Sequence, residues 1–539
     1  MLCFVLLICM CLVTNGYSLP RLDPLVETSV GLIKGVQATD GDYSMFLGIP
    51  YAQIDPQNPF GHNLPQPKFE TPFNANADGT SCPQGGGQGT YDCLRLNIFV
   101  PSTANEQNRL PIMLWIHGGA FQSGNGGKST FGPKYLMLKD VILVTINYRV
   151  GLYGFMCLDI PEVPGNAGLK DQAAALRWIK QNIAAFGGDE NNITIFGGSA
   201  GAASVDLQLR YNKEDVIQKA IMQSGIASGS WAIQRHDPKS AINIANRLGF
   251  TTTNSLEAVK YLASQTPSAV LTTSRQLGIE TWPCVEQEFP GVDRFIHDYA
   301  MNVEIPRAKN TPIMVGYNDD EWLSRYVRLR PEQFATIGIF KQNLLEAFDL
   351  NDTELKELED VIMRFYLGDD GLTIERIFDI ADFDTDFTFV HPIETAIKQY
   401  LENGGTDVYR YLFSYVGGRN HIKYNMNTDL GGAYHGDEKG YLFDISIFGE
   451  PNDEDRRMID RHTTMWTNFA KYGNPTPEVT DVLPVKWPAV TEKESYYLDM
   501  GKEFVVGQRP FHDRVAFWDL VYLMNERKRW GYKPKTNKS

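Results

Sequence analysis

The most constraining feature of this sequence is a tight turn, Gly197-Gly198-Ser199-Ala200-Gly201, in which an apolar run passes into a helix-like run. The segment before the turn, Asn192 to Phe196, is rich in β-branched and aromatic residues, as strands are. Glycines two residues before and two after Ser199 indicate a close approach of strand and helix, because a Cβ at either position would collide. The pattern predicts a strand–turn–helix that presents the Ser199 hydroxyl at the carboxyl end of a sheet.

Short apolar runs alternate with helical runs over most of the chain. Residues 169–179 have the periodicity of an amphipathic helix, with Leu169, Ala173 and Leu176 toward a sheet. This alternation predicts an α/β fold with a large, mostly parallel central sheet and helices on both faces. The runs predicted to be strands are 110–116, 141–148, 193–196, 217–223, 312–316 and 408–414.

We expect a single domain over residues 19–539, because no low-complexity linker and no internal repeat divides the chain. Residues from about 340 to 402 are mostly helical in pattern and strongly charged, and we expect them to form a helical insertion that caps the sheet. The apolar stretch at residues 1–13 is too short for a membrane span, and residues 1–18 are predicted to be a secretory signal peptide. No later run approaches a membrane-spanning length, so an exported, extracellular protein is expected.

Cysteine use agrees with export. Cys82 and Cys93 bracket a glycine-rich loop, and a disulfide that closes this loop is expected in an oxidising compartment. Cys157 and Cys284 lie in apolar contexts and are expected to be buried free thiols. No pair of cysteines or histidines lies at ligand spacing beside a second pair, so neither a metal nor a cofactor is expected. The glycosylation sequons open at Asn192, Asn351 and Asn537.

The charge balance excludes one class of partner. The formal net charge of −15 would repel phosphate backbones, so nucleic-acid binding is disfavoured. Apolar residues make up 43% of 539 positions, which is enough to build a large core.

A serine hydroxyl becomes a useful nucleophile only when a base takes its proton and a carboxylate orients that base. Among the nine histidines, His435 is the best candidate for the base, because it lies in a glycine-flanked loop just before an apolar run. His421 is the second candidate, in a less characteristic setting.

Three consecutive carboxylates, Asp319, Asp320 and Glu321, directly follow one of the predicted strands. They lie between Ser199 and His435 in the sequence, which is the order of serine, acid and histidine found in hydrolases with such a turn. The residues alone do not separate the three, and a solvated acidic loop is the alternative.

The run His117-Gly118-Gly119-Ala120 follows another predicted strand. Its glycine pair is free to turn N–H groups inward, where they would stabilise the negative charge of a tetrahedral intermediate. We therefore predict an oxyanion hole formed by the N–H groups of Gly118, Gly119 and Ala200, with a plain tight turn as the alternative.

Together these segments resemble the type-B carboxylesterase family, which includes cholinesterases and juvenile hormone esterases, and the chain looks most like secreted insect carboxylesterases. The likeness covers nearly the whole chain and implies an α/β-hydrolase fold. The matching segments are residues 46–52, 92–97 with Cys82 upstream, 165–172, 186–189, the turn around Ser199, 468–475 and 487–488.

The resemblance implies that Ser199 is the nucleophile, Glu321 the acid and His435 the base of a serine esterase without a cofactor. It places Ser224 as a second serine near these groups, and Trp231 in the acyl pocket. With Phe121 and Trp282 as further aromatic residues near the site, the expected substrate is a small to medium apolar ester.

Some positions depart from the family. Gly198 replaces a glutamate beside the nucleophile, Tyr91 replaces a glutamate, and Trp322 replaces the glycine after the acid. The loop between Cys82 and Cys93 lacks the tryptophan that would hold a quaternary ammonium, so acetylcholine is not expected as the substrate. The alternatives are a non-catalytic adhesion protein of the neuroligin type and a lipase that acts on long-chain glycerides.

Overall fold

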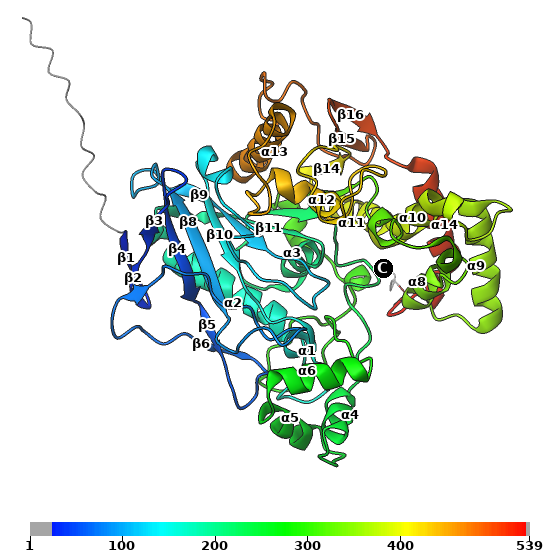
Figure 1. Cartoon of the computed structure of the whole chain (residues 1–539), viewed down its shortest axis with the longest axis horizontal. Helices are drawn as coiled ribbons and strands as arrows, with labels where there is room; N and C mark the ends of the chain where they lie inside the picture. Colours follow the sequence, from blue (N-terminus) through cyan, green and yellow to red (C-terminus); the bar gives the residue numbers. More distant parts are fainter. Residues whose placement is uncertain (1–23, 535–539) are drawn as a thin grey trace, which may run out of the picture.

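The structure, a computed structural model, describes residues 24–534. The expected signal peptide at residues 1–18 and the sequon at Asn537 lie outside the described residues. An eleven-stranded sheet crosses the molecule in the order β16-β15-β14-β13-β12-β11-β9-β10-β8-β4-β3 (Figure 1).

The strands are β1 (Leu25–Thr28), β2 (Gly31–Lys34), β3 (Val36–Gln37), β4 (Tyr43–Pro50), β5 (Ala52–Ile54), β6 (Asn63–Pro65), β7 (Phe73–Asn74), β8 (Arg95–Pro101), β9 (Leu110–Ile116), β10 (Ile142–Ile146), β11 (Gly188–Gly198), β12 (Lys219–Gln223), β13 (Ile313–Asn318), β14 (Val408–Phe413), β15 (Tyr496–Met500) and β16 (Phe504–Gln508). The α-helices are α1 (Gly151–Phe155), α2 (Ala167–Asn182), α3 (Ala200–Tyr211), α4 (Ser240–Arg247), α5 (Ser255–Ala263), α6 (Pro267–Gln276), α7 (Pro331–Phe334), α8 (Ile339–Ala347), α9 (Asp352–Leu367), α10 (Ile377–Thr385), α11 (His391–Glu402), α12 (His421–Met426), α13 (Asp453–Tyr472) and α14 (His512–Met524). The short helices are η1 (Leu136–Lys139), η2 (Ile183–Phe186), η3 (Ala300–Asn302), η4 (Pro306–Lys309), η5 (Leu323–Arg325), η6 (Ile374–Arg376), the π-helical turn η7 (Asp386–Val390), η8 (Asp437–Tyr441) and η9 (Glu526–Lys528).

The centre of the sheet is parallel, as predicted. Strands β9 to β15 pair in parallel with their neighbours. Antiparallel pairing is confined to the two edges, where β8, β4 and β3 extend one side and β16 the other. Each of the six runs predicted to be strands overlaps one of these parallel strands, although β11 and β13 extend beyond the predicted runs 193–196 and 312–316.

Helices cover both faces of the sheet. Alternate residues of each strand point to opposite faces, and both sets are apolar and need to be buried. In β9, Ile112, Leu114 and Ile116 pack in the same core as α2 and α3. The intervening Met113 and Trp115 pack with α13 and η1 on the other face. The α/β fold predicted from the alternation of apolar and helical runs is confirmed.

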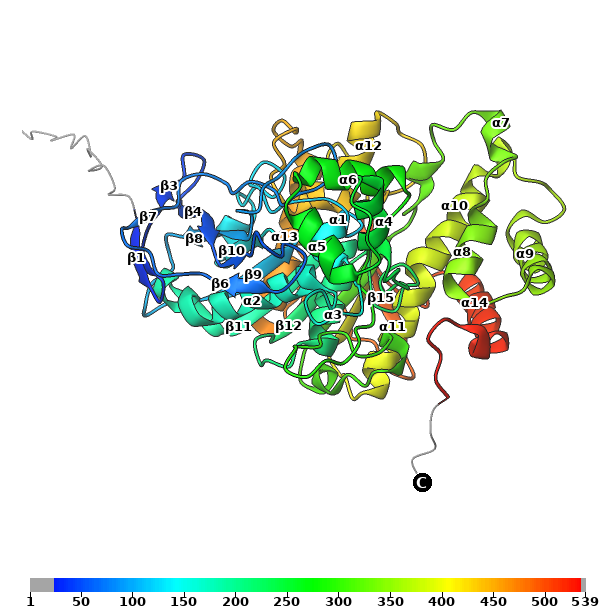
Figure 2. The same ribbon diagram turned by 90° about the horizontal axis from the view of Figure 1, so that it is seen from below.

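Residues 339–402 form helices α8 to α11, with the π-helical turn η7 joining α10 to α11. Figures 1 and 2 place α8, α9, α10 and α14 together at the end of the molecule opposite β1 and β2. These helices enclose a third apolar core that includes Phe340, Phe383 and Trp518. Asn351, at one of the sequons, caps α9 by accepting hydrogen bonds from the N–H groups of Thr353 and Glu354.

The turn around Ser199 joins β11 directly to α3. Ser199 has φ 59° and ψ −127°, a backbone conformation that L-residues rarely adopt. A Cβ at Gly197 would lie 2.6 Å from the backbone carbon of Gly201, and a Cβ at Gly201 would overlap the carbonyl oxygen of Ile116 in β9. The two glycines are therefore required because strand and helix backbones touch here.

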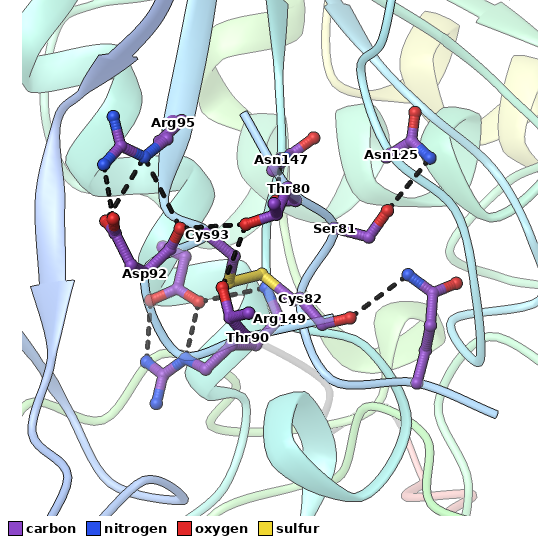
Figure 3. Close-up of a disulfide and its surroundings, with 12 residues drawn as sticks. Thr80, Ser81, Cys82, Thr90, Asp92, Cys93, Arg95, Asn125, Asn147 and Arg149 are labelled. Carbon is purple, nitrogen blue, oxygen red and sulfur yellow. Dashed lines mark hydrogen bonds and ion pairs between the residues drawn. A yellow bond between two sulfur atoms is a disulfide. The ribbon is translucent and has the colours of Figure 1, made fainter. Parts of the chain in front are cut away.

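Residues 24–534 contain two disulfides. Cys82 and Cys93 are joined across 11 residues, beside the ion pair of Asp92 with Arg95 and the hydrogen bond between Thr80 and Thr90 (Figure 3). This short bridge agrees with the sequence expectation.

The expectation of free thiols at Cys157 and Cys284 is wrong, because these residues form the second disulfide. They are 127 residues apart, and the fold brings the end of α1 against the loop that precedes η3. A Cβ at Gly165, which has φ 118°, would lie 2.6 Å from the Cys284 sulfur. This pairing depends on tertiary packing and has no signal in local sequence spacing.

One sequence expectation concerns the membrane. Within residues 24–534, no helix combines the length and apolar composition needed to cross a bilayer.

We expect the Gly201→Ala substitution to destabilise the fold, because the added methyl group would overlap the backbone of β9. Overpacking against side chains typically costs about 1–3 kcal/mol, and a rigid backbone allows less relaxation. Thermal unfolding of the purified variant should show a clear fall in melting temperature. The control is Gly371→Ala, since a Cβ at Gly371 meets open space. Equal melting temperatures for the two variants would contradict the role given to Gly201.

Candidate active site

Ser199 occupies the junction of β11 and α3, at the carboxyl end of the parallel strands. Its N–H donates to the carbonyl of Gln223, the last residue of β12, at 2.8 Å. A Cβ on Gly118 would lie 2.9 Å from the Cβ of Ser199, so the loop after β9 packs directly against the serine. The structure thus brings the predicted nucleophile and the predicted oxyanion loop together.

Glu321 and His435 form a hydrogen-bonded pair. Glu321 Oε2 lies 2.5 Å from His435 Nδ1, and the backbone N–H of His435 donates to the backbone carbonyl of Glu321 at 2.9 Å. The Glu321 side chain is fully buried, whereas the His435 side chain is 15% exposed. A carboxylate at Nδ1 fixes the orientation and tautomer of the ring and leaves Nε2 for proton transfer.

A buried polar network links this pair to the serine turn. The N–H of Asn318, at the end of β13, donates to Glu321 Oε1 at 2.8 Å, and its Nδ2 donates to the Tyr434 carbonyl at 2.6 Å. Asn318 Nδ2 also donates to Glu438 Oε2, and the other oxygen of Glu438 accepts from Gln223 Nε2 at 3.1 Å. The residue whose carbonyl holds the Ser199 N–H is therefore joined to the loop that carries His435.

The electrostatics of the network follow from burial. Burial raises the pKa of Glu438, an effect opposed mainly by its hydrogen bond from Asn318. Burial also lowers the pKa of His117 to about 4, so this histidine beside the glycine pair is neutral at physiological pH. The His117 ring stacks on Tyr148 at 4.3 Å and takes no part in the Glu321 pair.

The loop at 118–120 suits an anion receptor. Gly119 has φ 122° and Ala120 has φ 54°, so the chain turns sharply after β9. Ala200 is the first residue of α3, and its N–H therefore has no acceptor within the helix. Gly118, Gly119 and Ala200 flank Ser199 on the side of β9 and on the side of α3.

The other two carboxylates of the 319–321 cluster have a different task. Asp319 Oδ1 accepts from the N–H of Ala433 at 2.6 Å, and Asp320 Oδ2 accepts from the N–H of Gly432 at 2.5 Å. They fasten the glycine-rich loop that precedes His435, while Glu321 alone of the three bonds to the imidazole. The second histidine candidate, His421, begins α12, and burial lowers its pKa to about 4.

A chain of aromatic rings extends from the oxyanion loop to His435. Phe121 lies 6.2 Å from Trp231, Trp231 lies 6.4 Å from Phe389, and Phe389 stacks on His435 at 4.8 Å. Two of the expected pocket aromatics, Phe121 and Trp231, thus lie in one apolar wall with the histidine. Phe121 and Phe389 are buried, and Trp231 is partly buried.

The remaining pocket candidates are Ser224 and Trp282. Ser224 follows β12, is buried, and its Oγ has no hydrogen-bond partner within the described residues. Trp282 is partly buried against the main core in the loop before η3, where the neighbouring carbonyl of Thr281 accepts from Gln122 Nε2 at 2.6 Å.

Sequence reasoning missed Asn318, Gln223, Glu438 and Phe389. The first two are the last residues of their strands, a position that would have drawn attention to them. Glu438 lies three residues after His435 in an acidic pair that resembles a solvated surface. Phe389 gave no signal, because its position depends on the π-helical turn η7.

The departures from the family pattern have visible consequences. A Cβ at Gly198 would lie 3.3 Å from the Trp115 ring, which fills the space beside this position. Tyr91 packs against Tyr153, with ring centroids 5.7 Å apart. Trp322 lies 4.8 Å from the His435 ring.

Two further predicted features are placed by the structure. Asn192 is half-buried in β11 and accepts a hydrogen bond from Lys219, whereas Asn351 is exposed at the start of α9. Among residues 24–534, a cluster with metal-ligating atoms is formed by Cys157, Cys284 and His236, but its two sulfurs are bonded to each other.

Residues 22–518 match the family described as the Carboxylesterase family. Because the match spans most of the chain, this protein belongs to the carboxylesterase family.

Related proteins agree with this assignment. The chain is 33% identical to bile salt-activated lipase of Rattus norvegicus, over 93% of this chain and 86% of that protein. It is 30% identical to juvenile hormone esterase of Heliothis virescens, over 91% of this chain and 92% of that protein. Among solved structures, it superposes on juvenile hormone esterase from Manduca sexta, with OTFP covalently attached, at a TM-score of 0.82 and 26% identity, covering 93% of this chain and all of the other.

The protein is a carboxylic ester hydrolase with an α/β-hydrolase fold, and its substrates are small-molecule esters.

We expect the stability of the site to depend on pH through Asp319. Burial, reinforced by the nearby Asp320, raises the pKa of Asp319 from 3.8 to about 7. The folded state therefore binds a proton that the unfolded state releases between pH 4 and 7, so this contribution to stability is complete below pH 4 and is lost as the pH rises to about 7. Asp319→Asn removes the titration but keeps an oxygen for the Ala433 N–H.

The measurement is the melting temperature of wild type and Asp319→Asn at several pH values between 4 and 8. The melting temperature of wild type, relative to the variant, should fall as the pH rises through this window. A difference that stays constant with pH would rule out the assignment.

Proposed function

We propose that this protein is a secreted serine esterase that cleaves small to medium apolar esters through an acyl-enzyme on Ser199. The observation that carries the proposal is the hydrogen-bonded pair of Glu321 and His435, joined by Asn318, Glu438 and Gln223 to the turn that presents Ser199.

In the acylation step, His435 takes the proton of the Ser199 hydroxyl as Oγ attacks the ester carbonyl carbon. The tetrahedral intermediate carries its negative charge on the former carbonyl oxygen, which the N–H groups of Gly118, Gly119 and Ala200 stabilise. The intermediate collapses by breaking the bond to the alcohol oxygen. His435 donates its proton to that oxygen, and the alcohol leaves.

In the deacylation step, water attacks the acyl carbon while His435 takes a proton from it. The second tetrahedral intermediate collapses, the bond to Ser199 Oγ breaks, and His435 returns the proton to the serine. The carboxylic acid leaves. Glu321 stays ionised throughout and stabilises the imidazolium that forms in each step.

The preference for apolar esters is supported by the aromatic wall. This wall consists of the rings of Phe121, Trp231 and Phe389, which follow one another from the oxyanion loop to the histidine. We expect one side of the ester to lie along it. Transfer of an apolar acyl or alcohol group from water to such a surface is favourable by about 25 cal/mol per Å² of apolar area buried.

Secretion is supported by the apolar N-terminal sequence and by the two disulfides, which persist in oxidising compartments. In this setting the exposed Asn351 is the better placed of the two sequons in the described chain for glycosylation.

A long-chain lipase is the second candidate, favoured by the 33% identity to bile salt-activated lipase. Hydrolysis of p-nitrophenyl butyrate and p-nitrophenyl palmitate separates the two. A small-ester esterase has the higher kcat/KM for the butyrate, and a lipase has the higher value for the emulsified palmitate.

We expect a fluorophosphonate probe to label the wild-type protein covalently, because a serine activated by histidine displaces fluoride from the probe and becomes phosphonylated. Ser199→Ala should abolish both labelling and ester hydrolysis. The Glu321→Gln and His435→Gln variants should lose at least about 1,000-fold in kcat/KM, as is typical when a triad member is removed.

Ser264→Ala, which changes an exposed serine at the C-terminal end of α5, is the matched control and should label like wild type. An unlabelled wild-type protein, or labelling that survives Ser199→Ala, would favour the non-catalytic adhesion class instead.

A further inference from the structure

Two aromatic side chains, which also contact each other, pack against the imidazole of His435 from one side. Phe389 stacks on it with ring centroids 4.8 Å apart and an angle of 19° between the planes. Trp322 lies at the same centroid distance with an angle of 40°, and it contacts Phe389 at 5.1 Å. The glycine expected at position 322 in this family would leave one of these contacts unmade.

Trp322 is itself fixed from the other direction. The Arg325 guanidinium lies 3.6 Å from the centroid of its ring, and the backbone N–H of Trp322 donates to Thr385 Oγ1 at 3.1 Å. Arg325 is held by a salt bridge to Asp384 at 2.9 Å. The tryptophan is therefore packed between a catalytic imidazole and an anchored cation.

Asp384 connects Arg325 and Trp322 to the helical segment, which is residues 339–402. Its carboxylate is fully buried in α10 and also accepts hydrogen bonds from the Tyr326 hydroxyl at 2.7 Å and from Asn343 Nδ2 of α8 at 3.2 Å. The Thr388 hydroxyl donates to the same carboxylate at 3.3 Å. Removing the carboxylate would leave four donors, with Arg325 among them, without this acceptor, which is destabilising in a buried site. Asp384 thus fixes Arg325 relative to two helices.

Phe389 reaches the imidazole from the same segment. It lies in the π-helical turn η7, whose extra residue per turn displaces the side chains that follow from their α-helical positions. The carbonyl of the preceding Thr388 accepts a hydrogen bond from Trp231 Nε1 at 3.1 Å. Residues of α10 therefore hold Trp322, and η7 carries Phe389.

We propose that Trp322 and Phe389 are positioning residues that hold His435 in line with Ser199, and that Asp384 acts through Arg325 to keep Trp322 in place. This inference rests on the proposed function. It gives the helical segment a role in the chemical step, beyond covering the end of the sheet.

The physical reason is the freedom left to the ring. Glu321 restrains Nδ1, but a single hydrogen bond allows the imidazole to swing about its side-chain torsions, which moves Nε2 away from the serine. The two adjacent rings block the rotation of the imidazole toward their side. They also favour the imidazolium that forms in each step, since a cation above a ring face is attracted by about 0.5–2 kcal/mol. A misplacement of about 1 Å in such a system costs on the order of 100-fold in rate.

The experiment compares Trp322→Gly and Trp322→Phe in the full-length protein, with p-nitrophenyl butyrate as substrate. Rates are expressed per active site, counted by exhaustive labelling with a fluorophosphonate, so that unfolded molecules do not contribute. We expect Trp322→Gly to lower kcat by about 10- to 100-fold. KM should stay within about twofold, because His435 serves acylation and deacylation alike and KM depends on the ratio of their rates. Trp322→Phe should recover most of the loss, since it restores a ring face.

Trp530→Gly is the matched control. Trp530 also carries an arginine over its ring, Arg235 at 3.7 Å, but it contacts the carbonyl of Leu345 at the C-terminal end of the chain and has no contact with His435. Its kcat should equal that of wild type. A loss of kcat in Trp530→Gly as large as that in Trp322→Gly would reduce the effect to general destabilisation and overturn the inference.

Arg325→Gln covers the case in which Trp322→Gly does not fold. Arg325 is partly exposed, with 42% of its side-chain surface accessible, so its replacement is tolerated more easily. It should lower kcat per active site by about three- to tenfold at unchanged KM.

The outcomes separate the two hypotheses. If wild type neither labels nor hydrolyses esters, the proposed function fails. If wild type is active but Arg325→Gln and the folded Trp322 variants keep wild-type kcat, or lose activity only through KM, the positioning role fails while the esterase assignment stands.

Discussion

The contact on which this structure depends is the meeting of two backbones, where Gly201 at the start of α3 lies against the carbonyl of Ile116 at the end of β9. No side chain fits between them. This contact fixes the direction in which α3 leaves the sheet, and hence the left-handed conformation of Ser199. It also brings the loop after β9 to the serine, since Gly118 packs on Ser199 two residues beyond Ile116. One close approach thus sets both the nucleophile and the N–H groups beside it.

The rest of the site follows from the parallel order of β11, β12 and β13. Parallel neighbours end at the same edge of a sheet, so the last residues of β12 and β13, Gln223 and Asn318, lie next to the serine turn. Both are amides with a donor and an acceptor, and together they satisfy the buried carboxylate of Glu438. The site is therefore held as a unit, and the loop of His435 is tied to the sheet at several points.

Much of this arrangement could be predicted from the sequence, because its signals are local. Continuous apolar runs identified the parallel strands, and glycine spacing around Ser199 identified the turn. The choice of Glu321 over Asp319 and Asp320 needed the family resemblance, since three adjacent carboxylates after one strand look alike. The structure separates them by the direction of each side chain, with two fastening the 432–433 loop and one facing the imidazole. Phe389 and the pairing of Cys157 with Cys284 could not be predicted, because a π-helical turn and a contact across 127 residues leave no periodic trace.

The two disulfides also differ in when they can form during synthesis of the chain. The loop between Cys82 and Cys93 can close as soon as a short stretch has emerged from the ribosome, whereas Cys157 must wait for 127 further residues before its partner exists. During that interval the thiol is available to an oxidoreductase or to the wrong cysteine. A reducing cytoplasm disfavours both bridges, so recombinant material made there and material made in an oxidising compartment would be different covalent species.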